Sequence, residues 1–153
     1  MSLKLEEVRI KGNEIDLILV NISLANKFLS RTKTYFYDIV LHGTNEVVGH
    51  IDLRLGMNKS LYYYGNIGYT VYQKYRGNNY AYQACKLLKT VAKAEKMKQL
   101  IITCNPDNFA SLRTCELLGA KSIGAVKVPM IHPLYLNGEK IKCVFILEIE
   151  ERL

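Results

Sequence analysis

The residues best placed to carry chemistry run from Ile67 to Ala81, where a strand-like segment passes through a short polar loop into a helix-like segment. A helix N-terminus offers unpaired N–H groups and the positive end of the helix dipole, so it binds anions. Gly77 lets the backbone curl around an anion, and Asn79 tolerates the left-handed backbone conformation almost as glycine does. The loop therefore predicts a phosphate-binding site.

The charge of the chain is concentrated around this loop. The net charge is +7, and the segment between Lys74 and Gln99 contains seven Lys and Arg residues but a single acidic residue, a Glu. An anionic partner close to this segment is one explanation. A solvated, lysine-rich helix face is the other, and the charges alone do not separate the two.

Two segments together resemble the GNAT superfamily, the acyl-CoA-dependent N-acetyltransferases. Residues 75–81 read Tyr-Arg-Gly-Asn-Asn-Tyr-Ala, like the family's pyrophosphate loop Tyr-Arg-Gly-x-Gly-Tyr-Ala, with Asn79 at the second glycine and Lys74 at the preceding Gln/Arg position. Residues 105–119 are similar to the family's Asn-x-x-Asn-x-x-Ser segment with its following Glu-x-x-Gly. The resemblance covers about residues 35–119 well and the two ends only loosely.

The resemblance implies an acetyl-CoA-dependent N-acetyltransferase, with two strands splaying apart to admit the pantetheine arm. The acceptor would be a primary amine, either a small molecule or a protein N-terminus. Two other interpretations of the same residues remain: Tyr80 and Ala81 pack in the first helical turn, and Asn108 only caps a helix. The implied acetyl-CoA contacts are Tyr69, Thr70, Val71, Lys74, Arg76, Gly77, Asn78, Asn79, Tyr80, Ala81, Asn108 and Ser111.

The catalytic residues are less well marked. Many family members carry a tyrosine, four residues after the serine, that protonates the CoA thiolate; here that position is Cys115. A thiol with a pKa near ~8.5 is able to donate a proton to another thiolate, whereas the alternative is that Cys115 is a small buried residue. An alkyl amine is neutral in only about 1 in 2500 molecules at pH 7, so Asp52 and His50 are our candidate proton acceptors, acting through water.

Aromatic residues suggest where the acceptor binds. Ten of the eleven tyrosines lie between Tyr35 and Tyr82, including the run Tyr62, Tyr63 and Tyr64. Strand propensity accounts for many of them, but aromatic walls with polar tips also suit an amine. We therefore predict that the acceptor binds at Tyr62–Tyr64.

The hydrophobic periodicity predicts the elements that hold these residues. Alternation at two-residue spacing predicts strands over Tyr35–Leu41, Val47–Leu55, Tyr62–Tyr72 and Ile141–Ile149. Helical spacing predicts a helix over Asn79–Lys96 and another from about Asn108 to Leu118, which ends at Gly119. The remaining predictions are a first strand over Leu3–Ile10, a helix over Glu14–Phe28, and strands over Leu100–Cys104 and Ile123–Val128. A connection over Pro129–Pro133 follows the last of these strands.

The whole pattern is that of a mixed α/β (α+β) protein: one GNAT-like domain over residues 1–153 with a mostly antiparallel central sheet, a splayed strand pair and flanking helices. Four cysteines without a C-x-x-C pair predict neither a metal site nor a disulfide framework. The apolar runs are too short to span a membrane, and the N-terminus lacks a secretory signal, so we expect a cytoplasmic protein.

Three functional hypotheses follow. The first is the acetyl-CoA-dependent transferase, and the second is a non-catalytic acyl-CoA sensor of the same fold. The third is a nucleic-acid binder using the basic helix, but the chain carries no RNA-binding or helix-turn-helix signature, which argues against it. Exposed edge strands at the C-terminal end would permit a homodimer, although nothing in the sequence requires one.

Overall fold

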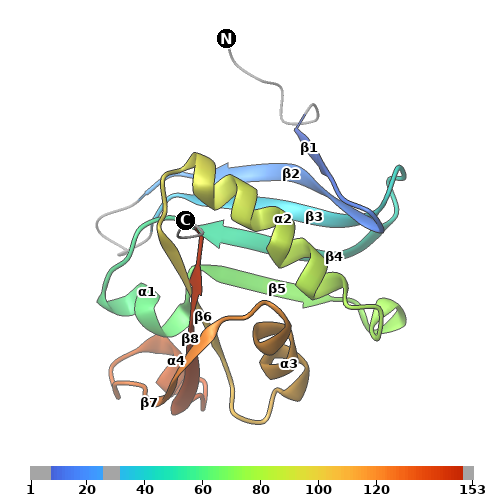
Figure 1. Ribbon diagram of the computed structural model, residues 1–153. Helices are drawn as coiled ribbons and strands as arrows, with labels where there is room; N and C mark the ends of the chain where they lie inside the picture. The colour runs from blue at the N-terminus through green and yellow to red at the C-terminus, as the bar shows by residue number, and fades with distance from the viewer. Residues whose placement is uncertain (1–7, 26–31, 150–153) are drawn as a thin grey trace.

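The structure is a computed structural model that describes residues 8–25 and 32–149. Two antiparallel sheets and their flanking helices build it (Figure 1). The elements in chain order are β1 (Arg9–Lys11), β2 (Ile15–Ser23), β3 (Thr34–Leu41), β4 (Val47–Arg54), α1 (Lys59–Tyr64), β5 (Ile67–Val71), a 3-10 turn (Gln73–Tyr75), α2 (Tyr80–Ala94), β6 (Gln99–Cys104), α3 (Phe109–Leu117), β7 (Lys121–Lys127), α4 (Pro133–Leu136) and β8 (Ile141–Glu148).

The larger sheet has five strands in the order β1-β2-β3-β4-β5. Each strand pairs antiparallel with its neighbour in sequence. Two-residue alternation puts Ile39, Ile51 and Leu53 on a buried face, and α2 lies across this face in Figure 1. The opposite face carries the cross-strand neighbours Asp38, His50 and Thr70.

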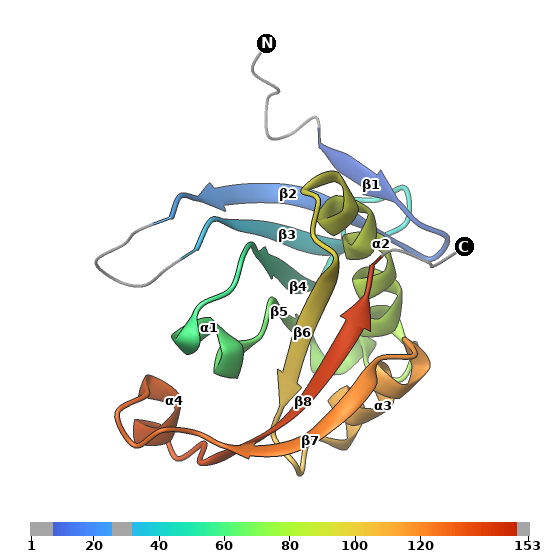
Figure 2. The ribbon, with the colours of Figure 1, turned by 60° about the vertical axis from the view of Figure 1, so that its left-hand side comes forward.

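The smaller sheet has three strands in the order β6-β8-β7. Figure 2 shows it turned steeply away from the larger sheet, with α3 beside it. Leu100, Ile102 and Leu147 from this sheet join the same hydrophobic core as the buried face of the larger one. The predicted mixed α/β fold with mostly antiparallel strands and flanking helices is therefore confirmed, but the described strands form two antiparallel sheets and not one mixed central sheet.

The helix predicted over Glu14–Phe28 is wrong in its described part, because Ile15–Ser23 form strand β2; residues 26–28 lie outside the described residues. Ile15, Leu17 and Leu19 are all buried at two-residue spacing, and a β-bulge between Leu19 and Asn21 interrupts the pairing with β3. The bulge shifts the apolar positions that follow by one residue, which imitates helical spacing in the sequence. Of the first predicted strand, Leu3–Ile10, residues 3–7 lie outside the described residues, and the described strand begins at Arg9.

The strand predicted over Tyr62–Tyr72 is wrong in its first half. Residues 59–64 form helix α1, and the Oδ1 atom of Asn58 accepts a hydrogen bond from the N–H of Leu61 (2.8 Å) at its start. Gly65 ends this helix with a φ of 81°, a left-handed conformation that favours glycine. Strand β5 then begins at Ile67.

The other predicted elements agree closely with the structure. Helices α2 and α3 and strands β3, β4, β6, β7 and β8 occupy the predicted segments, apart from small differences at their ends. Short helix α4 starts at Pro133, where the sequence predicted only a connection. Within residues 8–25 and 32–149, no helix is long and apolar enough to cross a membrane.

Candidate active site

A single buried asparagine joins β5 to β6. Asn66, 2% exposed, donates its backbone N–H to the Ile101 carbonyl (2.7 Å), and its Oδ1 accepts from the Ile101 N–H (2.8 Å). Its Nδ2 donates to the carbonyls of Arg54 (2.9 Å) and Gly56 (2.8 Å). Beyond this point β5 pairs with β4 and β6 pairs with β8, so in the described part of the chain the two strands separate and leave a slot.

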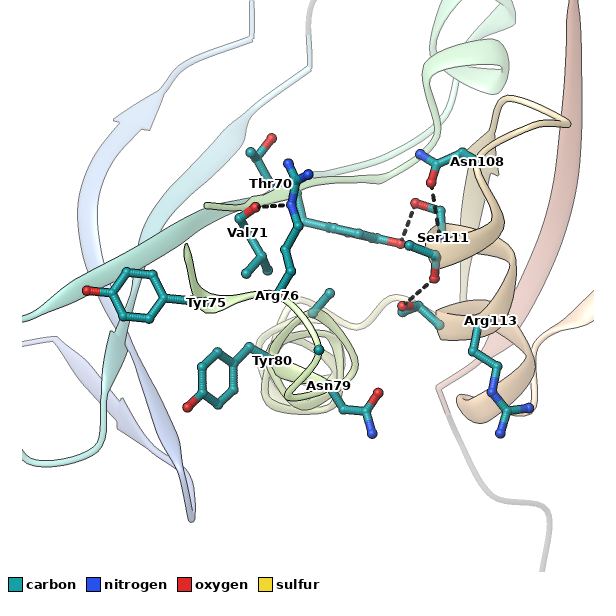
Figure 3. A pocket seen from close by; sticks show the side chains of 14 residues that line it. Thr70, Val71, Tyr75, Arg76, Asn79, Tyr80, Asn108, Ser111 and Arg113 are labelled. Atoms are coloured by element: carbon teal, nitrogen blue, oxygen red, sulfur yellow. Dashed lines mark hydrogen bonds between the residues drawn. The ribbon is translucent and has the colours of Figure 1, made fainter. Parts of the chain in front are cut away.

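A cavity of about 520 Å³ lies at the open end of this slot, between β5, the loop after it and α3 (Figure 3). Two of its cationic side chains are Arg76 and Arg113, which come from opposite walls. We name it the slot cavity. It is lined by Tyr69, Thr70, Val71, Tyr75, Arg76, Gly77, Asn79, Tyr80, Ala81, Asn108, Ala110, Ser111, Arg113 and Thr114.

The loop at one end of the slot cavity is shaped for an anion. Gly77 has a φ of 93°, and Asn79 is left-handed at φ 58°, so two left-handed residues turn the chain into α2. Among the described residues no side chain is placed to cap α2 from Asn79, which leaves the first N–H groups of the helix available to an anion. The Arg76 Nε–H donates to the Val71 carbonyl (2.9 Å), which holds this arginine at the rim.

The far end of the slot cavity is closed by Tyr69 and Ser111. The phenol of Tyr69 donates a hydrogen bond to Ser111 Oγ (3.0 Å), which links β5 to the first turn of α3. Asn108 caps that turn, because its Oδ1 accepts from the Ser111 N–H (3.2 Å). Burial raises the pKa of Tyr69 above its ordinary range, so the phenol keeps its proton.

A second cavity, of about 250 Å³, shares Tyr69, Asn108 and Ser111 with the slot cavity. We name it the junction cavity. Asn105 lines it, and the Asn105 Oδ1 is buried without a hydrogen-bond donor among the described residues. A buried polar atom without a partner costs stability unless a ligand or water supplies one, so this atom is a candidate contact for a bound donor.

The orientation of the Asn105 amide is set by an ion pair behind it. Lys142 Nζ donates to Glu139 Oε1 (2.8 Å), and Lys142 is almost completely buried. Hydrogen bonds from Lys142 and Asn105 hold the pKa of Glu139 below its ordinary value, so its carboxylate is charged and only accepts. The Asn105 NH₂ group therefore faces Glu139, which leaves the Oδ1 atom as the end of the amide without a protein partner.

A third cavity, of about 520 Å³, adjoins the junction cavity through Arg54 and Tyr64, which line both. We name it the outer cavity. Asp52 lies in its wall with its Oδ2 2.9 Å from Arg54 Nε. Burial raises the pKa of Asp52 more than the Arg54 charge lowers it. Hydroxyl groups of Ser23, Thr32, Thr34 and Ser60 make much of the remaining lining.

The family model for the acetyltransferase (GNAT) domain matches residues 14–121 of the chain. This is well over half of its length and includes both β5 and the anion-binding loop. The chain belongs to the GNAT acetyltransferase family. It is an acetyl-CoA-dependent acetyltransferase. None of the curated proteins compared with it matches.

Solved structures of acetyltransferases share the fold. A GNAT-family acetyltransferase from Bacillus anthracis is 28% identical, with a TM-score of 0.60 over 76% of this chain and 67% of that one. A ribosomal-protein-S5-alanine acetyltransferase from Vibrio fischeri is 12% identical, with a TM-score of 0.68 over 94% and 98%. The microcin C7 self-immunity acetyltransferase MccE, solved with acetyl-CoA and AMP, is 19% identical, with a TM-score of 0.57 over 75% and 61%.

The slot of this acetyltransferase fits acetyl-CoA in chemical character. The anion-binding loop and the two arginines suit phosphate groups, and the unpaired edge of β5 offers backbone groups to the amides of a pantetheine arm. The arm would then point from the loop toward Tyr69 and Ser111. The thioester would then lie where the slot cavity meets the junction cavity.

Most of the residues predicted to contact acetyl-CoA line the slot cavity, namely Tyr69, Thr70, Val71, Arg76, Gly77, Asn79, Tyr80, Ala81, Asn108 and Ser111. Two do not. Lys74 extends its Nζ over the Tyr75 ring (5.3 Å to the centroid), and the Asn78 amide donates to the Tyr75 carbonyl (3.0 Å). Sequence reasoning missed Tyr75, Ala110, Arg113 and Thr114. The last three lie at i, i+3 and i+4 counted from Ala110, so they share one face of α3.

Cys115 lies in the hydrophobic core, 0% exposed, and lines none of the three cavities. Burial raises the pKa of its thiol to about 12. A buried thiol off the slot is poorly placed to protonate CoA. We expect Cys115→Ala to keep most of the turnover; a loss near a hundredfold, measured as CoA release, would restore the acid role.

The residues predicted for the acceptor and the base are divided among different places. Asp52 and Tyr64 line the outer cavity, and Tyr64 also lines the junction cavity. Tyr62 and Tyr63 lie on α1 and line none of the three cavities; the Tyr63 ring instead packs edge-on against His132. His50 also lies outside these cavities, on the open face of the larger sheet, where Asp38 Oδ1 is 3.0 Å from its Nδ1 and the Tyr72 hydroxyl contacts its Nε2.

Proposed function

We propose that this acetyltransferase modifies a primary amine, and that the amine is the N-terminus of a polypeptide. The observation that carries the amine is the Asn105 Oδ1, a buried acceptor without a donor at the point where the acceptor substrate meets the slot. An amine brings the N–H group that this atom lacks. The hydrogen bond would turn the nitrogen lone pair toward the thioester.

The transfer balances as follows. The nitrogen lone pair attacks the thioester carbon, an N–C bond forms, and the C–S bond breaks with its electron pair on sulfur. The nitrogen loses one proton and the sulfur gains one, giving an amide and free CoA. Asp52, with its raised pKa, is our proposed proton acceptor through water in the outer cavity.

The two carboxylates beside the junction and outer cavities, Asp52 and Glu139, are each paired with a cation, which favours an α-amine as the acceptor. A peptide α-amine has a pKa of about 7.7–8.0, so roughly one molecule in ten is already neutral at pH 7, whereas a lysine side chain is neutral in about one in 2500. Asp52 is paired with Arg54, and Glu139 with Lys142. An acceptor that needs little help with deprotonation suits these surroundings.

Exposed apolar residues beside the cleft favour a polypeptide. Met130, Ile131 and Leu136 are 73%, 92% and 77% exposed. They flank Pro133 and Leu134, which line the outer and junction cavities respectively. Clustered large apolar side chains next to a cleft are typical of protein contacts. The structural neighbour named for a ribosomal-protein alanine supports the same proposal.

The test compares three kinds of acceptor in one assay, with CoA release and product mass as readouts. We expect acetylation of peptides with a free α-amine, and none of the same peptides with a formylated N-terminus and a free lysine. Turnover with small alkyl diamines alone would show that the acceptor is not a polypeptide. Acetyl-CoA bound intact with every amine would instead support the sensor.

Asn105→Ala is the matching test of the amine position. One neutral hydrogen bond is worth about 0.5–1.5 kcal/mol, so we expect KM for the acceptor to rise by about 2- to 10-fold while Kd for acetyl-CoA stays the same. Asn21→Ala, on an exposed part of β2, is the control. An equal loss of acetyl-CoA affinity would mean that Asn105 faces the pantetheine, contrary to the proposal.

A further inference from the structure

The departing thiolate needs a hydrogen-bond donor, and the structure narrows the choice. The phosphate end of acetyl-CoA belongs at the loop and the amine at Asn105, so the sulfur lies where the slot and junction cavities meet. The shared lining there is Tyr69, Asn108 and Ser111. The Asn108 Oδ1 is held in the helix cap, and the Asn108 NH₂ group is a weaker hydrogen-bond donor to a thiolate than a hydroxyl group, because an amide N–H is far less acidic.

The phenol of Tyr69 is the better placed of the two remaining hydroxyl groups. It comes from β5, the strand that forms one wall of the slot, and its hydroxyl reaches Ser111 on α3, at the other wall. The phenol proton points to Ser111 Oγ (3.0 Å). A thiolate is a stronger, anionic acceptor and would displace this hydrogen bond.

We propose that Tyr69 is a catalytic residue that donates a hydrogen bond to the CoA sulfur as the C–S bond breaks. The electron pair of that bond moves to sulfur, and the phenol stabilises the resulting thiolate. The nitrogen loses its proton toward the outer cavity, and the sulfur gains one from solvent when CoA leaves. This assignment rests on the proposed position of the amine at Asn105, but it does not depend on whether the amine belongs to a polypeptide or to a small molecule.

The acid strength of the phenol fits a donor that keeps its proton. Burial raises the pKa of Tyr69 above that of a free tyrosine and therefore above that of a thiol. Full transfer of its proton to sulfur would be uphill. A charge-assisted hydrogen bond needs no such transfer and acts where negative charge develops.

The first test measures the thiol pKa of enzyme-bound CoA from the ultraviolet absorbance of the thiolate. A hydrogen bond to a charged group is worth about one to two pKa units, so we expect the bound thiol to titrate that much higher in Tyr69→Phe than in the unaltered protein. Tyr35→Phe is the matched control, because it removes a phenol that donates to Glu95 (2.6 Å), outside the three cavities. Equal thiol pKa values in the unaltered protein and Tyr69→Phe would overturn the proposal.

Two further variants separate Tyr69 from its neighbours. Ser111→Ala should keep the low thiol pKa, because the phenol remains. A rise of the thiol pKa in Ser111→Ala as large as the rise in Tyr69→Phe would assign the donor role to Ser111. Cys115→Ala should also keep it. A thiol pKa in the unaltered protein no lower than that of free CoA in the same buffer would contradict the proposal without any variant.

Turnover gives an independent readout with a peptide acceptor. We expect Tyr69→Phe to lower kcat about 10- to 100-fold with acetyl-CoA and much less with an acetyl thioester of a more acidic aryl thiol, which needs no stabilisation on leaving. The same loss with both donors would point to a structural effect and against a donor at the sulfur.

Discussion

Asn66→Ala is expected to weaken acetyl-CoA binding at least tenfold and to lower the free energy of unfolding by about 3 kcal/mol or more. The side chain makes three hydrogen bonds at the apex of the slot, so its removal leaves the buried Ile101 N–H and two carbonyls without partners. The separation of β5 from β6 is set at this point. Loss of the apex changes the width of the slot along its whole length.

Isothermal titration with acetyl-CoA at low temperature, combined with urea unfolding, checks this result. Leu17→Ala is the control: Leu17 is fully buried on β2 and belongs to the core, and such a truncation costs about 2–5 kcal/mol. It should lose stability but bind acetyl-CoA normally. If Asn66→Ala loses as much stability as Leu17→Ala and still binds acetyl-CoA as tightly, then Asn66 stabilises the fold but does not shape the acetyl-CoA site.

The role of Asn66 could not be predicted from the sequence. Its main partner, Ile101, is 35 positions away, and neither residue lies in a recognisable pattern. The same distance problem explains the error at Tyr62–Tyr64. A run of three tyrosines has high strand propensity, but the Asn58 cap, Gly65 and the packing of α1 on β6 override it.

The anion-binding loop was predictable because its determinants are local. Gly77 and Asn79 both adopt the left-handed conformations that their residue types tolerate, and the helix begins directly after them. The junction and outer cavities were not predictable from the sequence, because Asn105, Glu139 and Arg54 come from distant parts of the chain. A cytoplasmic location and a homodimer stay predictions.

Asp16 is the second position where a single substitution is expected to have a large effect, here on stability and its pH dependence. The carboxylate is 0% exposed and accepts from the Gly12 N–H (2.9 Å), the Gly43 N–H (3.0 Å) and His42 Nδ1 (2.7 Å), besides an ion pair with Arg9 (2.8 Å). These contacts fasten the hairpin β1–β2 to the turn between β3 and β4. Asp16→Asn should lower the free energy of unfolding by about 3 kcal/mol at pH 7.

Acid should remove the advantage of the aspartate. Burial alone would raise the pKa of Asp16, but the hydrogen bonds from Gly43, His42, Gly12 and Arg9 outweigh it and hold the pKa far below the unfolded value of about 3.9. A group with a lowered pKa stabilises the fold fully above its unfolded pKa and progressively less as the pH falls toward its folded pKa. The stability difference between the two proteins should therefore be constant from pH 8 to about 5 and shrink below about pH 4.

Urea unfolding from pH 8 to pH 3 measures this difference, with Asp38→Asn as the control. Asp38 faces His50 on the open side of the larger sheet, and such partly exposed pairs contribute less than about 1 kcal/mol. A difference between Asp16→Asn and the unaltered protein that stays constant down to pH 3 would contradict the charge argument, because an uncharged role for Asp16 does not titrate. Since Asp16 lies on β1–β2, outside the three cavities, acetyl-CoA affinity should be unchanged in the folded variant.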